Sequence, residues 1–164
     1  DGRLALSTAP TATLVARALL PGVIVAAAQA IVLTAIGTSV LGLALPKAAA
    51  MAGLLVLTGV AFVLVNHALA AWLGNTGRLT TTAFAVLTTV SAVTGAVPPL
   101  FDSLRPLSPV SPALDGLRAL ITDSTGAAGA VFALLGWAAV GLAASAMAVL
   151  RRRTVRLTEL SALS

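Results

Sequence analysis

Long apolar stretches without charge dominate the pattern of this chain of 164 residues. Four windows contain no Asp, Glu, Lys or Arg: Ala18 to Pro46, Ala48 to Gly77, Leu79 to Phe101 and Ser124 to Leu150, with 29, 30, 23 and 27 residues. A bilayer hydrocarbon core about 30 Å thick is crossed by roughly 20 apolar helical residues. We therefore expect an all-α, polytopic membrane helix bundle with four transmembrane helices in this chain.

The windows predict helices and not the strands of a barrel. Apolar residues follow one another without alternation, as in Val23 to Ala28, whereas the strands of a membrane barrel alternate over about ten positions. A segment in lipid must satisfy its own backbone hydrogen bonds, which a helix does. Composition agrees, because only 9% of residues are charged and 59% are hydrophobic, against roughly a quarter charged in soluble domains.

The chain forms a single membrane domain in this interpretation, with spanning helices at 18–45, 48–73, 79–97 and 126–150. Residues 1–17 are expected to approach the membrane along its interface, and 151–164 to form a tail on the same side. The first tight turn is placed at 45–47. The second is placed at 74–78, where glycine suits the left-handed end of a helix.

The segment 98–123 differs from the windows on either side. It holds five of the eight prolines and five charged residues, too many charges for a spanning helix, yet it is too hydrophobic for a free loop. We expect a re-entrant or interfacial helical segment on the outer side, broken near Pro106 and Pro109. Irregular backbone persists at membrane depth only where protein or water covers it, so Pro98 and Pro109 are candidate structural residues.

A short helix is predicted within this segment. Ser111 followed by Pro112 is typical of a helix N-cap and first turn. Asp115 and Arg118 are spaced to pair along that helix, and both are candidate structural residues of the outer segment. The apolar face would consist of Leu114, Leu117, Leu120 and Ile121.

The distribution of Lys and Arg predicts an orientation. With four spans, one side receives seven basic residues, Arg3, Arg17, Arg78, Arg151, Arg152, Arg153 and Arg156. The other side receives three, Lys47, Arg105 and Arg118. Because basic residues are enriched in cytoplasmic loops, we expect both ends of this chain in the bacterial cytoplasm and 98–123 outside.

A few polar side chains fall inside the predicted helices. For His67, next to Asn66, a proton relay or a ligand is one interpretation. An interhelical hydrogen bond is favoured, since no acidic residue lies within any helix and intramembrane carboxylates usually mark ion pathways. Gln29 is expected to hydrogen-bond to a neighbouring helix, with substrate contact as the alternative.

The third predicted helix carries a stripe of small, weakly polar residues that would either pack closely or line a path: Thr81, Thr88 and Ser91.

Several chemistries are not expected. The chain has no cysteine, no GxxxxGK[ST] phosphate loop and no HExxH motif, so we expect no enzyme, cofactor or metal site. The net charge of +5 comes from residues spread over loop ends, which favours the lipid bilayer as partner, through anionic headgroups, over nucleic acid. The chain opens on Asp1 without a leader pattern, and we expect it to be the C-terminal part of a longer protein.

Five short motifs follow one another along the chain: ALLPG leading to Gln29, LGNTGR at 73–78, GAVP at 95–98, LRPLSP at 104–109 and DGLR at 115–118. In this order they resemble the C-terminal membrane region of the YhgE/Pip (phage infection protein) family, which is similar in turn to the permeases of type 2 ABC exporters. The resemblance covers roughly residues 14–153.

The resemblance implies a six-helix domain of which this chain would supply the last four helices, after a large extracytoplasmic region. Members have been associated with phage adsorption, type VII secretion and export. Our first hypothesis is an export-type membrane domain that forms a homodimer or larger assembly, with a separate ATPase subunit as partner. The second is a membrane anchor for a large outer interaction domain, acting as a secretion component or phage receptor.

Overall fold

The computed structural model describes residues 11–74, 76, 79, 82 and 108–161; for Thr11 and 152–161 it describes the backbone alone. These residues form four helices, α1 (Thr11–Leu41), α2 (Leu45–Leu73), α5 (Val110–Ile121) and α6 (Ala127–Ser161). Ala12–Leu41, Leu45–Leu73 and Ala127–Arg151 are long and apolar enough to cross a membrane. The all-α class is therefore confirmed, with three membrane-span-like helices. The expected span at 79–97 lies outside the described residues.

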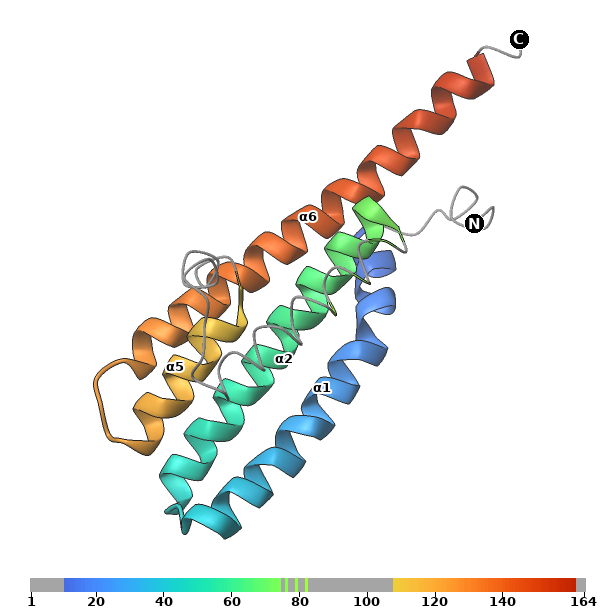
Figure 1. Cartoon of the computed structure of the whole chain (residues 1–164). Coiled ribbons are helices and arrows are strands. Elements are labelled where there is room, and N and C mark those ends of the chain that lie inside the picture. Colours follow the sequence, from blue (N-terminus) through green and yellow to red (C-terminus); the bar gives the residue numbers. More distant parts are fainter. Residues whose placement is uncertain (1–10, 75, 77–78, 80–81, 83–107, 162–164) are drawn as a thin grey trace.

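The three long helices run side by side, with α2 in contact with α1, α5 and α6 (Figure 1). Helix α6 runs parallel to α2, and α1 runs antiparallel to both. We call one end of the bundle the Lys47 end; it contains the turns at 42–44 and 122–126. The opposite end, where α1 begins and α2 finishes, is the Arg151 end. Beyond it α6 continues past the other helices (Figure 1).

The first helix differs at both ends from the expected 18–45. It begins at Thr11, so 11–17 are its first turns and not a separate interfacial segment. The reason is packing, because Val15 and Leu19 are buried against Leu64 of α2. The turn to α2 lies at 42–44 and not at 45–47, because Gly42 adopts a φ of +61°, which glycine does without steric cost.

Helix breakers explain the remaining helix ends. Gly74 has a φ of +64° and donates its N–H to the carbonyl of Ala70, so the expected stop after α2 is confirmed. Helix α6 runs to Ser161 and not to residue 150. The arginines that follow the apolar window do not interrupt a helix, and the sequence has no Gly or Pro there.

Pro21 lies inside α1. A proline within a helix lacks a backbone N–H, and its ring bends the helix.

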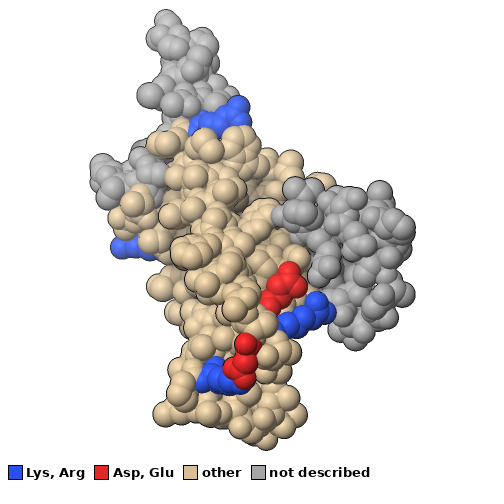
Figure 2. Space-filling model, turned by 90° about the vertical axis from the view of Figure 1, so that its left-hand side faces the viewer, with Lys and Arg blue, Asp and Glu red and all other residues tan. Residues whose placement is uncertain are grey.

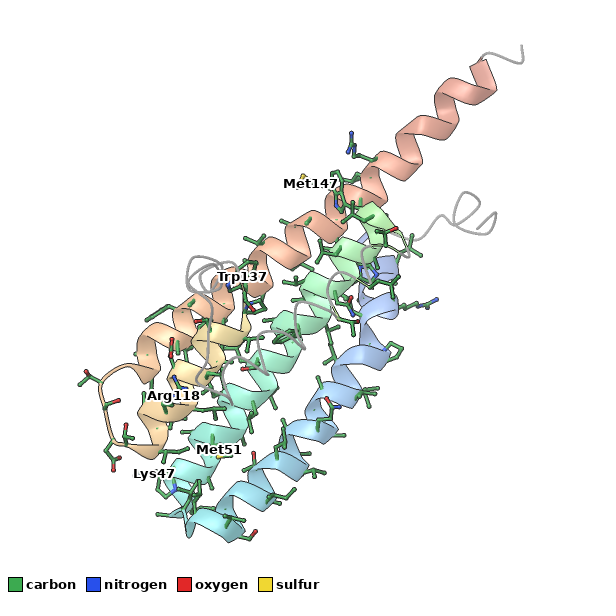
Figure 3. All side chains as sticks on the ribbon, in the orientation of Figure 1. Lys47, Met51, Arg118, Trp137 and Met147 are labelled. Carbon is green, nitrogen blue, oxygen red and sulfur yellow. The ribbon has the colours of Figure 1, made fainter. Side chains whose placement is uncertain are left out.

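Small residues bring the helices together. The main core cluster consists of Leu54 and Ala61 of α2, Ala113 of α5 and Leu134 of α6. Many large apolar side chains point outward (Figure 3), which is the arrangement that lipid as the surrounding solvent allows. The bundle therefore holds together through narrow contacts between helices and not through a wide core.

Candidate functional site

Helix α5 is too short to span a membrane and lies inside the bundle beside the first half of α6 (Figure 1). Its 12 residues correspond to about 18 Å, against about 30 Å for a hydrocarbon core. Its last turn is at the Lys47 end. Its first turn lies near Trp137, since Ser111 and Trp137 border the same groove. A half-length helix, of the kind expected within 98–123, is therefore present at 110–121.

The start of α5 lies one Ser-Pro pair earlier than expected. Pro109 is the N-cap, and the Oγ of Ser108 accepts a hydrogen bond from the N–H of Val110 at 3.2 Å. Ser108 is 1% exposed, so protein atoms surround this cap. Ser111 and Pro112 are in the first turn and not at the cap. Pro98 and Pro106 lie outside the described residues.

The end of α5 is closed by backbone hydrogen bonds. The N–H of Thr122 donates to the carbonyl of Arg118 at 2.9 Å, and the N–H of Ser124 donates to that of Ala119 at 3.0 Å. Between them Asp123 has a φ of +55°, a conformation that Asp tolerates better than most residues. The carboxylate of Asp123 then reaches Lys47, with Nζ and Oδ2 2.6 Å apart. This ion pair joins the first turn of α2 to the turn at 122–126.

Small residues form the buried face of α5. Ala113, Gly116 and Ala119 are buried, and a Cβ on Gly116 would lie 2.8 Å from Cβ of Ala130 and 2.9 Å from Leu54. The expected apolar face was only partly right: Leu117 and Leu120 pack against the core, but Ile121 is 45% exposed. In the sequence, small residues recur every three positions at Ala113, Gly116 and Ala119. This spacing indicates the closely packed face of α5, and it was not used in the prediction above.

The opposite face of α5 carries the expected ion pair. Arg118 Nη1 and Asp115 Oδ1 are 3.8 Å apart, with both side chains more than half exposed. Asp115 is six residues before the end of α5, which places it about 9 Å inward along the helix axis. Charged residues at membrane depth are costly and usually have a function or a partner.

A groove of about 380 Å³ lies between α5 and α6. Ser111, Pro112 and Asp115 border it from α5, and a smooth wall of Gly126, Gly129, Ala130 and Ala133 borders it from the other side, together with Trp137. Figure 3 shows Trp137 on α6 at the level where α5 begins. The groove thus combines an acidic and hydroxyl border with an apolar wall.

The polar residues expected inside the helices have different surroundings. His67 Nδ1 and Ser145 Oγ lie 3.2 Å apart across α2 and α6, so the expected interhelical hydrogen bond of His67 is present. Asn66 and Gln29 are exposed, and in the described part of the chain Gln29 has no interhelical hydrogen bond. Thr81, Thr88 and Ser91 lie outside the described residues.

A second polar contact between α2 and α6 was not expected. Trp72 donates its Nε1–H to the carbonyl of Ala144 at 2.9 Å. The guanidinium carbon of Arg151 lies 4.9 Å from the centre of the Trp72 ring, within the range of a cation–π contact. Neither contact has a signal in the sequence, because both depend on how two distant helices are rotated against each other.

Among the described residues, no three His, Cys, Asp or Glu side chains lie close enough together to hold a metal ion. No protein-family model, curated protein or solved structure matches the chain.

Proposed function

We propose that this chain is the integral membrane domain of an export-type, permease-like transport protein of the cytoplasmic membrane, similar to the YhgE/Pip family. The observation that carries the proposal is α5. This half-length helix is packed inside the bundle, has an exposed Asp115–Arg118 pair and borders a groove. A helix that served only to anchor would have no need to place charges at membrane depth.

The direction of the flanking helices supports the same architecture. Helix α2 finishes at the Arg151 end and α6 begins at the Lys47 end. One further span between them, as proposed for 79–97, would connect these two ends. With that span the chain contributes four crossings, as the resemblance to permease domains implies.

The proposed orientation has the Arg151 end in the cytoplasm. Arg17 is in the first turns of α1 and Arg151 stands over Trp72, so both lie toward this end. Lys47 and Arg118 lie toward the other end, each paired with an aspartate, and Figure 2 shows the two acidic side chains beside basic ones in the lower half of the molecule. With Arg152, Arg153 and Arg156 in the part of α6 that follows, the Arg151 end has five of the basic residues of the described helices and the Lys47 end has two. An excess of basic residues is typical of the cytoplasmic side.

Single cysteines test this orientation, since the chain has no cysteine of its own. In intact cells, Ser124→Cys should react with an impermeant maleimide, and Ser161→Cys should react only after the membrane is opened. The reverse pattern would refute the orientation.

Filling the groove tests transport. Gly129 borders the groove, and a Cβ there would meet nothing within 4 Å, so Gly129→Trp should occupy the groove without moving the helices. Gly136→Trp is the matched control, because Gly136 is equally open but is not in the groove wall. We expect ATP-dependent movement of a fluorescent phospholipid across inside-out vesicles to fall to background in Gly129→Trp and to persist in Gly136→Trp.

The protein is assayed in vesicles from its native membrane, so that a separate ATPase partner is retained. Equal phospholipid movement in Gly129→Trp and Gly136→Trp would show that the groove is not part of the transport path. If the unmodified protein causes no ATP-dependent movement beyond vesicles that lack it, the transport function is wrong. The anchoring hypothesis would then predict that the outer domain works equally well when fused to an unrelated membrane anchor.

A further inference from the structure

The Arg151 end of α2 and α6 carries a fixed aromatic and cationic pair that the proposed transport path does not use. The indole of Trp72 is held by its hydrogen bond to Ala144, and the guanidinium of Arg151 lies over the ring. Helical side chains lean toward the N-terminus of their helix, so Arg151 reaches back over Trp72 from two turns beyond Ala144. Trp72 is nevertheless 45% exposed, and this pair therefore belongs to the surface.

Positive charge accumulates around this pair. Arg17 is exposed toward the same end, and α6 continues beyond Arg151 through Arg152, Arg153 and Arg156 to Ser161. The aspartates with described side chains, Asp115 and Asp123, lie toward the opposite end (Figure 2). Within the described helices, Glu159 is the one acidic residue beyond Arg151. The Arg151 end is therefore strongly cationic.

The length of α6 places the pair at the depth of lipid headgroups. The apolar part of α6, Ala127–Arg151, has 25 residues, which is about 37 Å of helix. With the 122–126 turn at one surface of a hydrocarbon core about 30 Å thick, Arg151 lies at the other surface. Trp is enriched at this depth because its ring is amphipathic.

The apolar surface next to the arginines distinguishes a lipid from a soluble anion. Leu73, Met147 and Leu150 are 56%, 52% and 51% exposed, and Figure 3 shows Met147 on the outer side of α6 close to this end. A nucleic acid or a free phosphate compound would leave these side chains uncovered. A phospholipid covers them with its acyl chains while its phosphate meets the Arg151 guanidinium.

We propose that Trp72 and Arg151 form a binding site for anionic phospholipid at the Arg151 end, where the sequence of α6 continues with further arginines. Arginine binds phosphate with paired, charge-assisted hydrogen bonds. The Trp72 ring orients Arg151 toward the headgroup layer. Each basic residue near an anionic membrane surface strengthens binding by about fivefold. The site is independent of transport through the groove.

Trp72 provides the readout. The chain has two tryptophans, so Trp137→Phe leaves Trp72 as its only fluorescent indole. This variant is reconstituted in phosphatidylcholine vesicles with a small fraction of brominated phosphatidylglycerol, or with the same fraction of brominated phosphatidylcholine. Bromine quenches tryptophan on contact, and we expect the relative association constant at Trp72 to favour phosphatidylglycerol by about fivefold or more.

Substitutions distinguish a binding site at the Arg151 end from a general electrostatic attraction of the basic protein for anionic lipid. In the same background, the combination Arg151→Gln, Arg152→Gln and Arg153→Gln should reduce the preference to about unity, while Lys47→Gln at the opposite end should leave it unchanged. Circular dichroism confirms that the triple variant is still helical. Soluble glycerol phosphate should not compete.

Three outcomes would overturn the proposal: equal quenching by the two lipids in the starting variant, a preference that survives in a folded triple variant, or displacement of the lipid by glycerol phosphate. The last result would assign the arginines to a soluble phosphate compound. Loss of the preference in Lys47→Gln would also count against a site at the Arg151 end. None of these results depends on whether the protein transports anything.

Discussion

The two sides of α2 are held by different kinds of contact. Toward α6, the backbones meet at Gly141, where a Cβ would lie 2.8 Å from the carbonyl carbon of Leu64. Two polar contacts, His67 with Ser145 and Trp72 with Ala144, follow along the same seam. Toward α1, each close approach is between a glycine and a side chain of the other helix: Gly22 faces Val63, Gly37 faces Met51 and Gly59 faces Cβ of Ala26. Among the described residues, no hydrogen bond joins α1 to α2.

This difference follows from the solvent that a membrane offers. Lipid gives apolar side chains no reason to associate, so helices pair through close packing and interhelical hydrogen bonds. The α2–α6 pair has both, and the α1–α2 pair has only the first. We infer that α2 and α6, with α5 between them at the Lys47 end, form a firm unit. We expect helix α1 to be held less firmly against that unit.

The largest expected effect is that of Gly141→Ala. The new methyl group would meet the Leu64 carbonyl carbon at 2.8 Å and the Val65 nitrogen at 2.9 Å, and backbone atoms can yield only if the helices separate. Overpacking of this kind costs about 1–3 kcal/mol. The measurement is unfolding of the purified chain by dodecyl sulfate in mixed micelles, followed by tryptophan emission.

Gly136→Ala is the control for that substitution. It lies in the same helix, and a Cβ there would meet nothing within 4 Å, so helix propensity should make it neutral or stabilising by up to about 1 kcal/mol. Equal stability of the two variants would mean that α2 and α6 are not in backbone contact at Gly141.

A smaller loss is expected for Gly59→Ala on the α1 side. Its Cβ would lie 2.6 Å from Cβ of Ala26, so α1 must move away. Because no hydrogen bond between the two helices is broken by that movement, we expect a loss of about 1 kcal/mol. Gly53→Ala, in the same helix with nothing within 4 Å, should be neutral or stabilising. A loss for Gly59→Ala as large as that for Gly141→Ala would show that α1 is held as firmly as α6.

The membrane spans were easier to predict than their ends. Charge-free windows identify the three long apolar helices because insertion into lipid depends on composition over about 20 residues. They give poor boundaries, because charge does not end a helix. Arg17 and Arg151 lie within helices, whereas Gly42, which is uncharged, makes the turn.

The first residue of α5 was harder to predict, because the same helix-start signal occurs twice in the sequence. Ser108-Pro109 and Ser111-Pro112 are both typical of a helix start, and the first is the one used. Of the candidate site, Asp115 with Arg118 was predictable from spacing alone. The groove was not, because it arises where Gly129 and Ala133 of α6 lie opposite α5, and no pattern within one helix reveals which neighbour it faces.

The smallest expected effect concerns the hydrogen bond of the firm unit. Ser145 is completely buried, and Ser145→Ala removes the partner 3.2 Å from His67 Nδ1. Interhelical hydrogen bonds in membranes contribute about 0.6 kcal/mol on average, and we expect a loss of about that size. Ser39→Ala, which removes a hydroxyl bonded within α1 alone, should change stability less. If Ser145→Ala is neutral, close packing at Gly141 and not hydrogen bonding accounts for the difference between the two sides of α2.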